Sequence, residues 1–249
     1  MNSILRWSIS LIFQFQVYAV MAIFGIIFAP YALMTHKGAI IACRLYCVWV
    51  LWTARWILGL QSEIRGNIPT GEVIIAAKHQ SFLDILMIFN AVPRAKFIMK
   101  RELLWTPFIG FYAKRLGCIP VNRGKKGVAI AKMVKDVALE FSEPGQLVIY
   151  PQGTRVAPKT YKPYKVGISI LYEELGQPCI PVATNAGLFW PKNKIRMNSG
   201  LAIVEFLDPI APNLPRKNFM SKLEQIVETR SNELIHETGL SQTAHNLRH

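Results

Sequence analysis

The longest uncharged apolar stretch of the chain is the feature that most restricts its fold. Residues 11–34, LIFQFQVYAVMAIFGIIFAPYALM, carry no charged side chain. As a helix rising about 1.5 Å per residue, they would extend roughly 36 Å, enough to cross a hydrocarbon core of about 30 Å. The apolar core of a signal peptide is shorter, about 7–15 residues. We therefore predict a retained membrane helix rather than a cleaved leader.

A second apolar segment, residues 39–60, contains charged side chains. Lys37, Arg44 and Arg55 would share one side of a helix. Three tryptophans would form an adjacent stripe: Trp49, Trp52 and Trp56. A basic stripe beside an aromatic stripe predicts a helix that lies in the membrane interface. The alternative is a second span whose arginines snorkel or face protein.

The basic residues near these segments predict an orientation. Only Arg6 precedes the first segment, whereas four basic residues follow it: Lys37, Arg44, Arg55 and Arg65. The positive-inside rule then places the rest of the chain in the cytoplasm, at the inner membrane of the cell. A second full span would reverse this orientation.

Composition agrees with a membrane-surface protein. The 249 residues carry a formal charge of +14 and are 51% hydrophobic. A soluble nucleic-acid binder would explain the charge but not the apolar content, so we expect no nucleic-acid partner. The four cysteines include no Cys-x-x-Cys pair and no zinc-ligand spacing. We expect buried, reduced thiols and no metal.

Beyond the apolar segments, strand-like and helix-like stretches alternate. We predict strands at residues 72–77, 95–99, 118–121, 146–150, 179–183 and 201–206, and helices at 82–91, 107–116, 126–141 and 217–236. This order predicts an α/β domain with a mixed, partly parallel sheet flanked by helices. Residues 61–70 are polar with Gly66 and Pro69, which predicts a linker. The chain then divides into membrane-anchoring helices, 1–60, and an α/β domain, 61–249.

His79 and Asp84 flank the start of a predicted helix. Ser81 and Asp84 form a capping-box pattern before the apolar run ILMIF, so Asp84 has a structural explanation as a helix cap. The same geometry directs a carboxylate toward His79. An Asp–imidazole contact would fix the histidine tautomer and stabilise imidazolium as it forms. His79 could then remove a proton from a substrate hydroxyl, with the substrate supplying the nucleophile.

Two further strand ends carry arginines. Arg123 follows the strand at 118–121, and the strand at 146–150 ends in Pro-Gln-Gly-Thr-Arg, residues 151–155. Glycine lets a backbone approach a ligand closely, and arginine suits bidentate phosphate recognition. Strand ends of an open α/β sheet converge where ligands bind. The predicted ligand carries a phosphate and a hydroxyl.

Four motifs in this order resemble the glycerolipid acyltransferase family, and its lysophosphatidic acid acyltransferase branch most closely. The first is His79, four residues, then Asp84. The second is GCIPVNRG with Arg123, the third is YPQGTR at 150–155, and the fourth is CIPVATNAG with a central proline. The segment YKVG at 164–167 resembles a Phe-Lys-x-Gly that often follows the third motif. Together they span about residues 75–187.

The resemblance implies an enzyme without metal or cofactor. The acyl donor would be an acyl-CoA or acyl-carrier-protein thioester, and the acceptor the sn-2 hydroxyl of 1-acyl-glycerol-3-phosphate in the bilayer. His79 and Asp84 would be catalytic. The substrate would be held by Arg123, Gln152, Gly153, Thr154 and Arg155.

One position departs from the family pattern. Gln152 stands where the family usually has Glu; it can hydrogen-bond a glycerol hydroxyl or orient Arg123, but it supplies no negative charge. Another lysolipid acceptor, such as a lyso-ornithine lipid, is therefore an alternative. A non-catalytic protein that binds anionic membranes is the alternative from another class.

Overall fold

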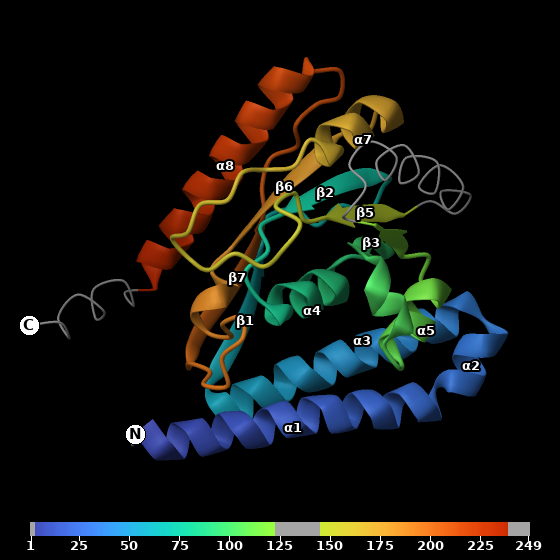
Figure 1. The fold of residues 1–249 in the computed structure, drawn as a ribbon, viewed down its shortest axis with the longest axis vertical. Coiled ribbons are helices and arrows are strands. Elements are labelled where there is room, and N and C mark those ends of the chain that lie inside the picture. Colours follow the sequence, from blue (N-terminus) through green and yellow to red (C-terminus); the bar gives the residue numbers. More distant parts are fainter. Residues whose placement is uncertain (1–2, 123–144, 239–249) are drawn as a thin grey trace, which may run out of the picture.

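The computed structural model describes residues 3–122 and 145–238. Figure 1 shows one sheet with helices on both faces. The strands are β1 (Leu60–Arg65), β2 (Val73–Ala77), β3 (Ala95–Lys100), β4 (Ile119–Val121), β5 (Gln146–Ile149), β6 (Cys179–Thr184) and β7 (Gly200–Phe206). The helices are α1 (Ser3–Ile27), α2 (Ala29–Met34), α3 (His36–Thr53), η1 (Ala54–Leu58), α4 (Phe82–Ala91), η2 (Arg101–Trp105), α5 (Ile109–Arg115), α7 (Gly167–Leu175), η3 (Ala186–Leu188) and α8 (Arg216–Glu237).

The seven strands form a mixed sheet in the order β1-β7-β6-β2-β5-β3-β4. All neighbouring pairs are parallel except β6 with β7, which is antiparallel. The central strand β2 is buried along its whole length, as expected for a parallel strand covered on both faces. The predicted mixed, partly parallel sheet flanked by helices is confirmed.

Strand alternation assigns the side chains of β2 to two separate cores. Ile75 and Ala77 belong to the core shared with α1, α3 and α4, whereas Ile74 and Ala76 belong to the core shared with α7 and α8. In Figure 1, α4 lies between the sheet and the α1–α3 pair, and α8 runs along the opposite side. Because successive residues face opposite sides, β2 delivers its following residues alternately to the two faces.

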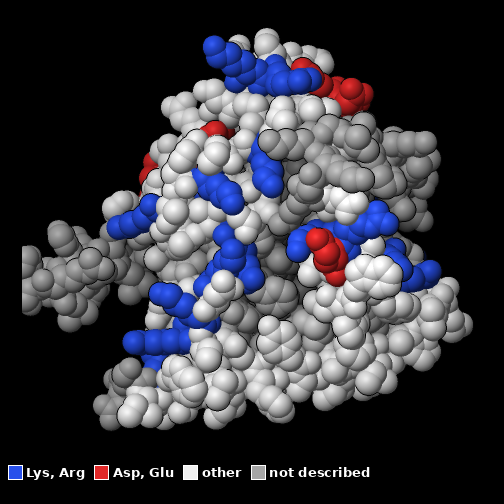
Figure 2. All heavy atoms as spheres, viewed as in Figure 1, with Lys and Arg blue, Asp and Glu red and all other residues white. Residues whose placement is uncertain are grey.

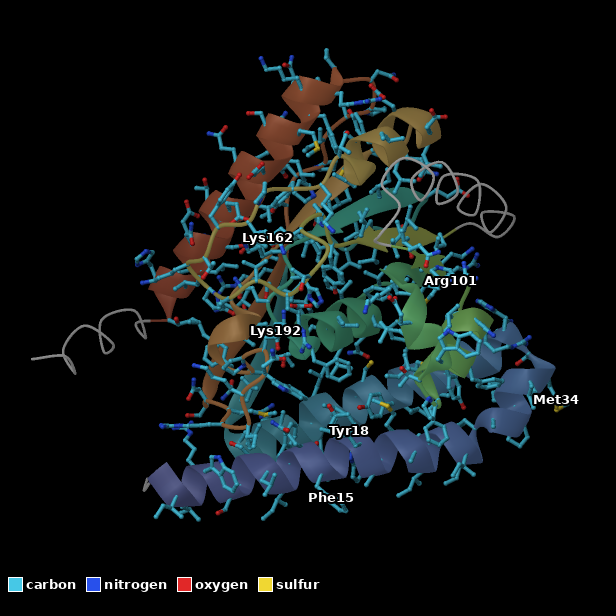
Figure 3. The ribbon with its side chains drawn as sticks, viewed as in Figure 1. Phe15, Tyr18, Met34, Arg101, Lys162 and Lys192 are labelled. Carbon is cyan, nitrogen blue, oxygen red and sulfur yellow. The ribbon has the colours of Figure 1, made fainter. Side chains whose placement is uncertain are left out.

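The two N-terminal apolar helices lie side by side along one flank of the molecule (Figure 1). Residues 4–27 and 36–58 are long and apolar enough to cross a membrane. Large apolar side chains are exposed on both helices, among them Phe15 at 75% and Trp56 at 70%. Phe15 points away from the sheet in Figure 3. An exposed apolar surface of this extent is consistent with membrane association.

Arg44 does not join a basic stripe that faces lipid headgroups. Its guanidinium donates to the carbonyl oxygens of Val92 and Pro93, both at 2.9 Å, at the end of α4. Lys37 and Arg55 are exposed. The interfacial stripe predicted for this helix is therefore wrong at Arg44, which faces protein as the alternative for this segment allowed.

The predicted linker at 61–70 is wrong over its first half, because residues 61–65 belong to β1. This strand pairs in parallel with β7, from Leu60 opposite Gly200 to Arg65 opposite Glu205. Its side chains are largely polar because it forms an edge of the sheet. Helix α7 was not predicted, and the helix predicted at 126–141 lies outside the described residues. The division of the chain at residue 60 stays a prediction.

Gly66, which follows β1, provides a test of this edge. Its φ is +78°, and a Cβ there would lie 1.9 Å from the carbonyl oxygen of Phe206. We expect Gly66→Ala to lower the free energy of unfolding by about 2 kcal/mol or more, since backbone strain and a backbone clash combine. Thermal unfolding in detergent measures the change. Gly71→Ala is the matched control, because nothing lies within 4 Å of a Cβ there; equal effects of the two substitutions would contradict the β1–β7 register.

Candidate active site

The candidate site begins where β2 ends and α4 starts. His79 follows β2 and projects toward the α4 face, and its Nδ1 lies 2.8 Å from Oδ1 of Asp84 in the first turn of α4. Asp84 is fully buried, whereas the imidazole keeps 13% of its surface exposed. The structure therefore brings together the two residues predicted to be catalytic.

The second carboxylate oxygen of Asp84 fixes the backbone around the histidine. Oδ2 accepts from the backbone amides of Gln80 and Ser81, at 2.8 and 2.7 Å. The Ser81 hydroxyl accepts from the Leu83 amide at 3.0 Å and donates to the Trp190 carbonyl oxygen at 2.6 Å. Asp84 thus completes the capping box that begins with Ser81 and is also the partner of the imidazole. One residue satisfies the structural and the chemical explanations together.

An aromatic ring supports the imidazole from the next strand. The ring of Tyr150, directly after β5, stacks on His79 with centroids 3.9 Å apart and planes 20° apart. Burial, followed by the nearby Asp84 carboxylate, raises the pKa of Tyr150 well above its ordinary value. Tyr150 therefore stays neutral, and its stacking limits the rotation of the imidazole. Sequence reasoning used Tyr150 only as part of a motif and missed this contact.

A cavity of about 1230 Å³ opens beside His79. Tyr150, Arg155 and Lys165 are among its lining residues, and side chains of α1, α3, α4, α5, β3 and the loop after η3 line much of the remainder. That remainder is mostly apolar, as Phe24 and Phe108 illustrate. The cavity therefore connects a polar site containing a potential base to an apolar volume bounded by the two N-terminal helices.

Among the described residues, the cations that line the cavity include Arg155, Lys165 and Lys194, and others lie on the same face. Figure 2 shows lysine and arginine side chains gathered around the hollowed centre of this face. Lys162 and Lys192, labelled in Figure 3, come from the loops that follow β5 and η3. Lys192 donates to the Thr154 hydroxyl at 3.3 Å and to the Arg155 carbonyl oxygen at 3.5 Å. The arrangement suits an anionic group.

The turn after β5 places its glycine at the cavity wall. Gly153 has φ +68°, and a Cβ there would lie 2.8 Å from Nζ of Lys165. The lysine side chain therefore passes directly over the glycine. Gly153, Arg155 and Lys165 all line the cavity, which brings two of the predicted turn residues together with a second cation. The YKVG resemblance was the signal for Lys165, although no role was predicted for it.

Gln152 has a different environment from its neighbours. Only 1% of its surface is exposed. Its Nε2 donates to the Lys162 carbonyl oxygen at 3.1 Å and lies 3.4 Å from Oε1 of Glu228 on α8. Its amide nitrogen is therefore directed toward α8, on the opposite side of the sheet from His79.

Arg123, the other predicted phosphate ligand, lies outside the described residues. Val121 and Asn122, which precede it, line the cavity. Within residues 3–122 and 145–238, no three His, Cys, Asp or Glu side chains are grouped to hold a metal ion. The roles assigned to individual site residues, and a reaction without metal or cofactor, stay predictions.

The geometry allows general-base chemistry on an anionic, partly apolar molecule. A histidine that bonds a buried carboxylate through Nδ1 presents Nε2 as its other nitrogen, the arrangement that serves proton abstraction in hydrolytic triads. A family model described as Acyltransferase matches residues 60–185, just over half of the chain.

This chain belongs to the Acyltransferase family.

Relatives and a solved structure agree with the motifs and the fold of this chain. The 1-acyl-sn-glycerol-3-phosphate acyltransferase of Pseudomonas aeruginosa is 30% identical over 149 residues, 59% of this chain and 58% of that protein. The human 1-acyl-sn-glycerol-3-phosphate acyltransferase alpha is 29% identical over 161 residues, 63% of this chain and 57% of that protein. The family resemblance seen in the sequence is confirmed.

The crystal structure of the 1-acyl-sn-glycerophosphate (LPA) acyltransferase PlsC from Thermotoga maritima has the same fold. It matches with a TM-score of 0.78 over 94% of this chain and 98% of that one, at 20% sequence identity. The sequence matches to the curated relatives are shorter: the chain spans less than three fifths of their length.

The helix cap provides a test of the site's structure. Ser81→Ala removes the acceptor of the Leu83 amide and the donor to Trp190, so we expect the free energy of unfolding to fall by about 1–2 kcal/mol. Thermal unfolding measures the change, and Ser81→Thr, which keeps a capping hydroxyl, is the control. A Ser81→Ala variant as stable as the wild type would contradict the capping role.

Proposed function

We propose that this acyltransferase moves an acyl chain from an acyl-CoA or acyl-carrier-protein thioester to the sn-2 hydroxyl of 1-acyl-glycerol-3-phosphate. The product would be phosphatidic acid for phospholipid biosynthesis. One observation carries the proposal: the His79–Asp84 pair stands where a cationic site meets an apolar cavity. A lysophosphatidic acid has the same three parts, namely a hydroxyl, a phosphate and an acyl chain.

The proposed reaction needs no covalent enzyme intermediate. His79 takes the proton of the acceptor hydroxyl while the oxygen attacks the thioester carbonyl carbon, and Asp84 stabilises the imidazolium that forms. When the tetrahedral intermediate collapses, the carbon–sulfur bond breaks and the proton leaves with the thiol. Tyr150 keeps the imidazole in place throughout. Ser81 acts only as the helix cap.

The proposed substrate position follows from the two ends of the cavity. The phosphate would contact Arg155 and Lys165, and Arg123 and Thr154 would complete its binding. Gly153 would let the backbone approach it closely. The acyl chains would extend into the apolar part of the cavity, toward α1 and α3. Because those helices expose apolar side chains on their outer surface, a lipid acceptor could pass from the bilayer to the histidine without crossing water.

We place the enzyme at the cell inner membrane with the α/β domain facing the cytoplasm. The exposed apolar surface of α1 and α3 supports membrane attachment. The charge bias, with Arg6 before the first helix and several cations after it, is the sequence argument for that orientation. In the structure Arg6 lies against the α/β domain and donates to the Met197 carbonyl oxygen at 3.2 Å, so this bias does not separate two sides of a membrane, and the orientation stays a proposal.

Removing the base tests the chemistry. We expect His79→Ala to lower the rate of acyl transfer from a labelled thioester to lysophosphatidic acid by about 10²- to 10⁴-fold, because no other group takes the proton. Asp84→Asn should also lower kcat strongly, since it loses the charge that orients and stabilises the imidazole. Product formation by purified enzyme in detergent measures both, and thermal unfolding shows whether the variants fold.

The outcome of this assay distinguishes the proposed function from its two alternatives. Phosphatidic acid from the wild type and none from His79→Ala supports both the reaction and the base. Acylation of a different lysolipid only, such as a lyso-ornithine lipid, would replace the acceptor. A folded wild type that acylates no lysolipid would favour an anionic-membrane-binding protein.

The cations at the cavity test the acceptor. We expect Arg155→Ala and Lys165→Met each to raise the KM for lysophosphatidic acid about tenfold, because each removes a charge-assisted contact to the phosphate. The KM for the thioester donor is the internal reference. Lys217→Ala, an exposed cation of α8, is the control. Unchanged acceptor KM values in both site variants would exclude phosphate binding at this end of the cavity.

A further inference from the structure

A buried polar cluster lies on the opposite side of the sheet from His79. We call Lys78, Gln152, Tyr164 and Glu228 the Glu228 cluster. Lys78 Nζ bonds both carboxylate oxygens of Glu228 at 2.6 Å. The Tyr164 hydroxyl donates to Oε1 of Glu228 at 3.1 Å, and Nε2 of Gln152 lies 3.4 Å from the same oxygen. One carboxylate on α8 therefore receives donors from three separate segments.

The cluster contains one ion pair, between Lys78 and Glu228, and both side chains are mostly buried. The side chain of Lys78 is 3% exposed and that of Glu228 is 21% exposed. Burial and then the Glu228 carboxylate raise the pKa of Tyr164, so its hydroxyl stays neutral and donates. Glu224, one turn earlier on α8, hydrogen-bonds the exposed Tyr161 and contributes less than Glu228 to the raised pKa of Tyr164. A buried ammonium without its carboxylate would be strongly destabilising, so Lys78 depends on Glu228.

Every donor of the cluster directly precedes a residue that lines the cavity. Lys78 precedes His79, Gln152 precedes Gly153, and Tyr164 precedes Lys165. For the first pair, the alternation of β2 explains why neighbouring side chains face opposite sides of the sheet. From the α8 side of the sheet, the carboxylate of Glu228 thus accepts hydrogen bonds from the three segments that carry the base and the phosphate-binding turn.

We propose that Glu228 is a positioning residue that sets the distance between the base His79 and the acceptor-binding residues Gly153 and Lys165. This role rests on the proposed function. It acts through the backbone, because the segment that ends at Lys78 and the turn that begins at Gln152 are bonded to the same carboxylate. The Lys162 carbonyl oxygen, which accepts from Gln152, ties the loop that leads to Tyr164 into the same arrangement.

The same charges explain the glutamine at position 152. Lys78 is balanced by one carboxylate, and that carboxylate is on Glu228. A glutamate at 152 would bring a second carboxylate to within about 3.4 Å of the first, in a buried site with one ammonium. Glu228 therefore supplies from α8 the negative charge that the family motif usually carries in the turn.

Moving the carboxylate between the two positions tests the proposal. Glu228→Gln should lower the melting temperature by roughly 5 °C or more and raise the KM for lysophosphatidic acid about tenfold, with a smaller change in donor KM. Gln152→Glu should also be destabilising. The double variant Gln152→Glu/Glu228→Gln restores one carboxylate, and should recover at least half of the melting-temperature loss and of the KM increase of Glu228→Gln.

A pH series distinguishes charge from shape. In Gln152→Glu two carboxylates share one ammonium, so the pKa of one of them is raised and the folded state gains protonation relative to the unfolded state. Its melting-temperature deficit against the wild type should therefore shrink as the pH falls from about 8 to about 5.5. The double variant has one carboxylate and should show no such trend.

A matched control substitution and the results that would overturn the proposal complete the test. Glu233→Gln makes the same substitution on α8 at an exposed ion pair with Arg230, and should change neither the melting temperature nor KM. Losses in the double variant that equal the sum of the single losses would overturn the proposal, as would a Glu228→Gln enzyme with unchanged stability and KM. If the wild type does not acylate lysophosphatidic acid, the proposed function is wrong. The melting temperatures would still test the role of the Glu228 cluster, because they do not depend on the reaction.

Discussion

The buried carboxylate of Asp84 is the interaction on which the rest of the site depends. One of its oxygens accepts two backbone amides and so fixes the turn from β2 into α4, while the other lies against Nδ1 of His79. A carboxylate removed from water needs such hydrogen-bond donors, and a helix N-terminus provides them. The residue whose bonds begin the helix therefore also orients the imidazole of His79.

The alternation of side chains along β2 places the candidate site on one side of the sheet and the Glu228 cluster on the other. His79, Tyr150 and the cavity lie on the side of α4 and the N-terminal helices, and the Glu228 cluster lies on the side of α8. Because a parallel strand is buried on both faces, a charged residue that leaves it on the far side needs a partner there. Lys78 has that partner in Glu228, at the end of β2 that is followed by His79.

Much of this could be predicted from the sequence because it is local. Short apolar runs, a capping box and glycine-containing turns are properties of short segments, and the six predicted strands, α4 and the His79–Asp84 contact all follow from them. The errors concern segments whose role depends on distant partners. β1 is polar because it is an edge strand held by β7, and Arg44 faces protein because the end of α4 presents two carbonyl oxygens to it.

The sequence by itself determined the family, the alternation of strands and helices, the pairing of a histidine with an aspartate five residues later, and the apolar character of the first two helices. Only the tertiary structure decided which cations meet at the cavity, that Tyr150 stacks on His79, and that Gln152 lies beside Glu228 rather than facing His79. The reason is separation along the chain: Gln152 and Glu228 are 76 residues apart. No local pattern encodes which side of a sheet a turn residue shares with a distant helix.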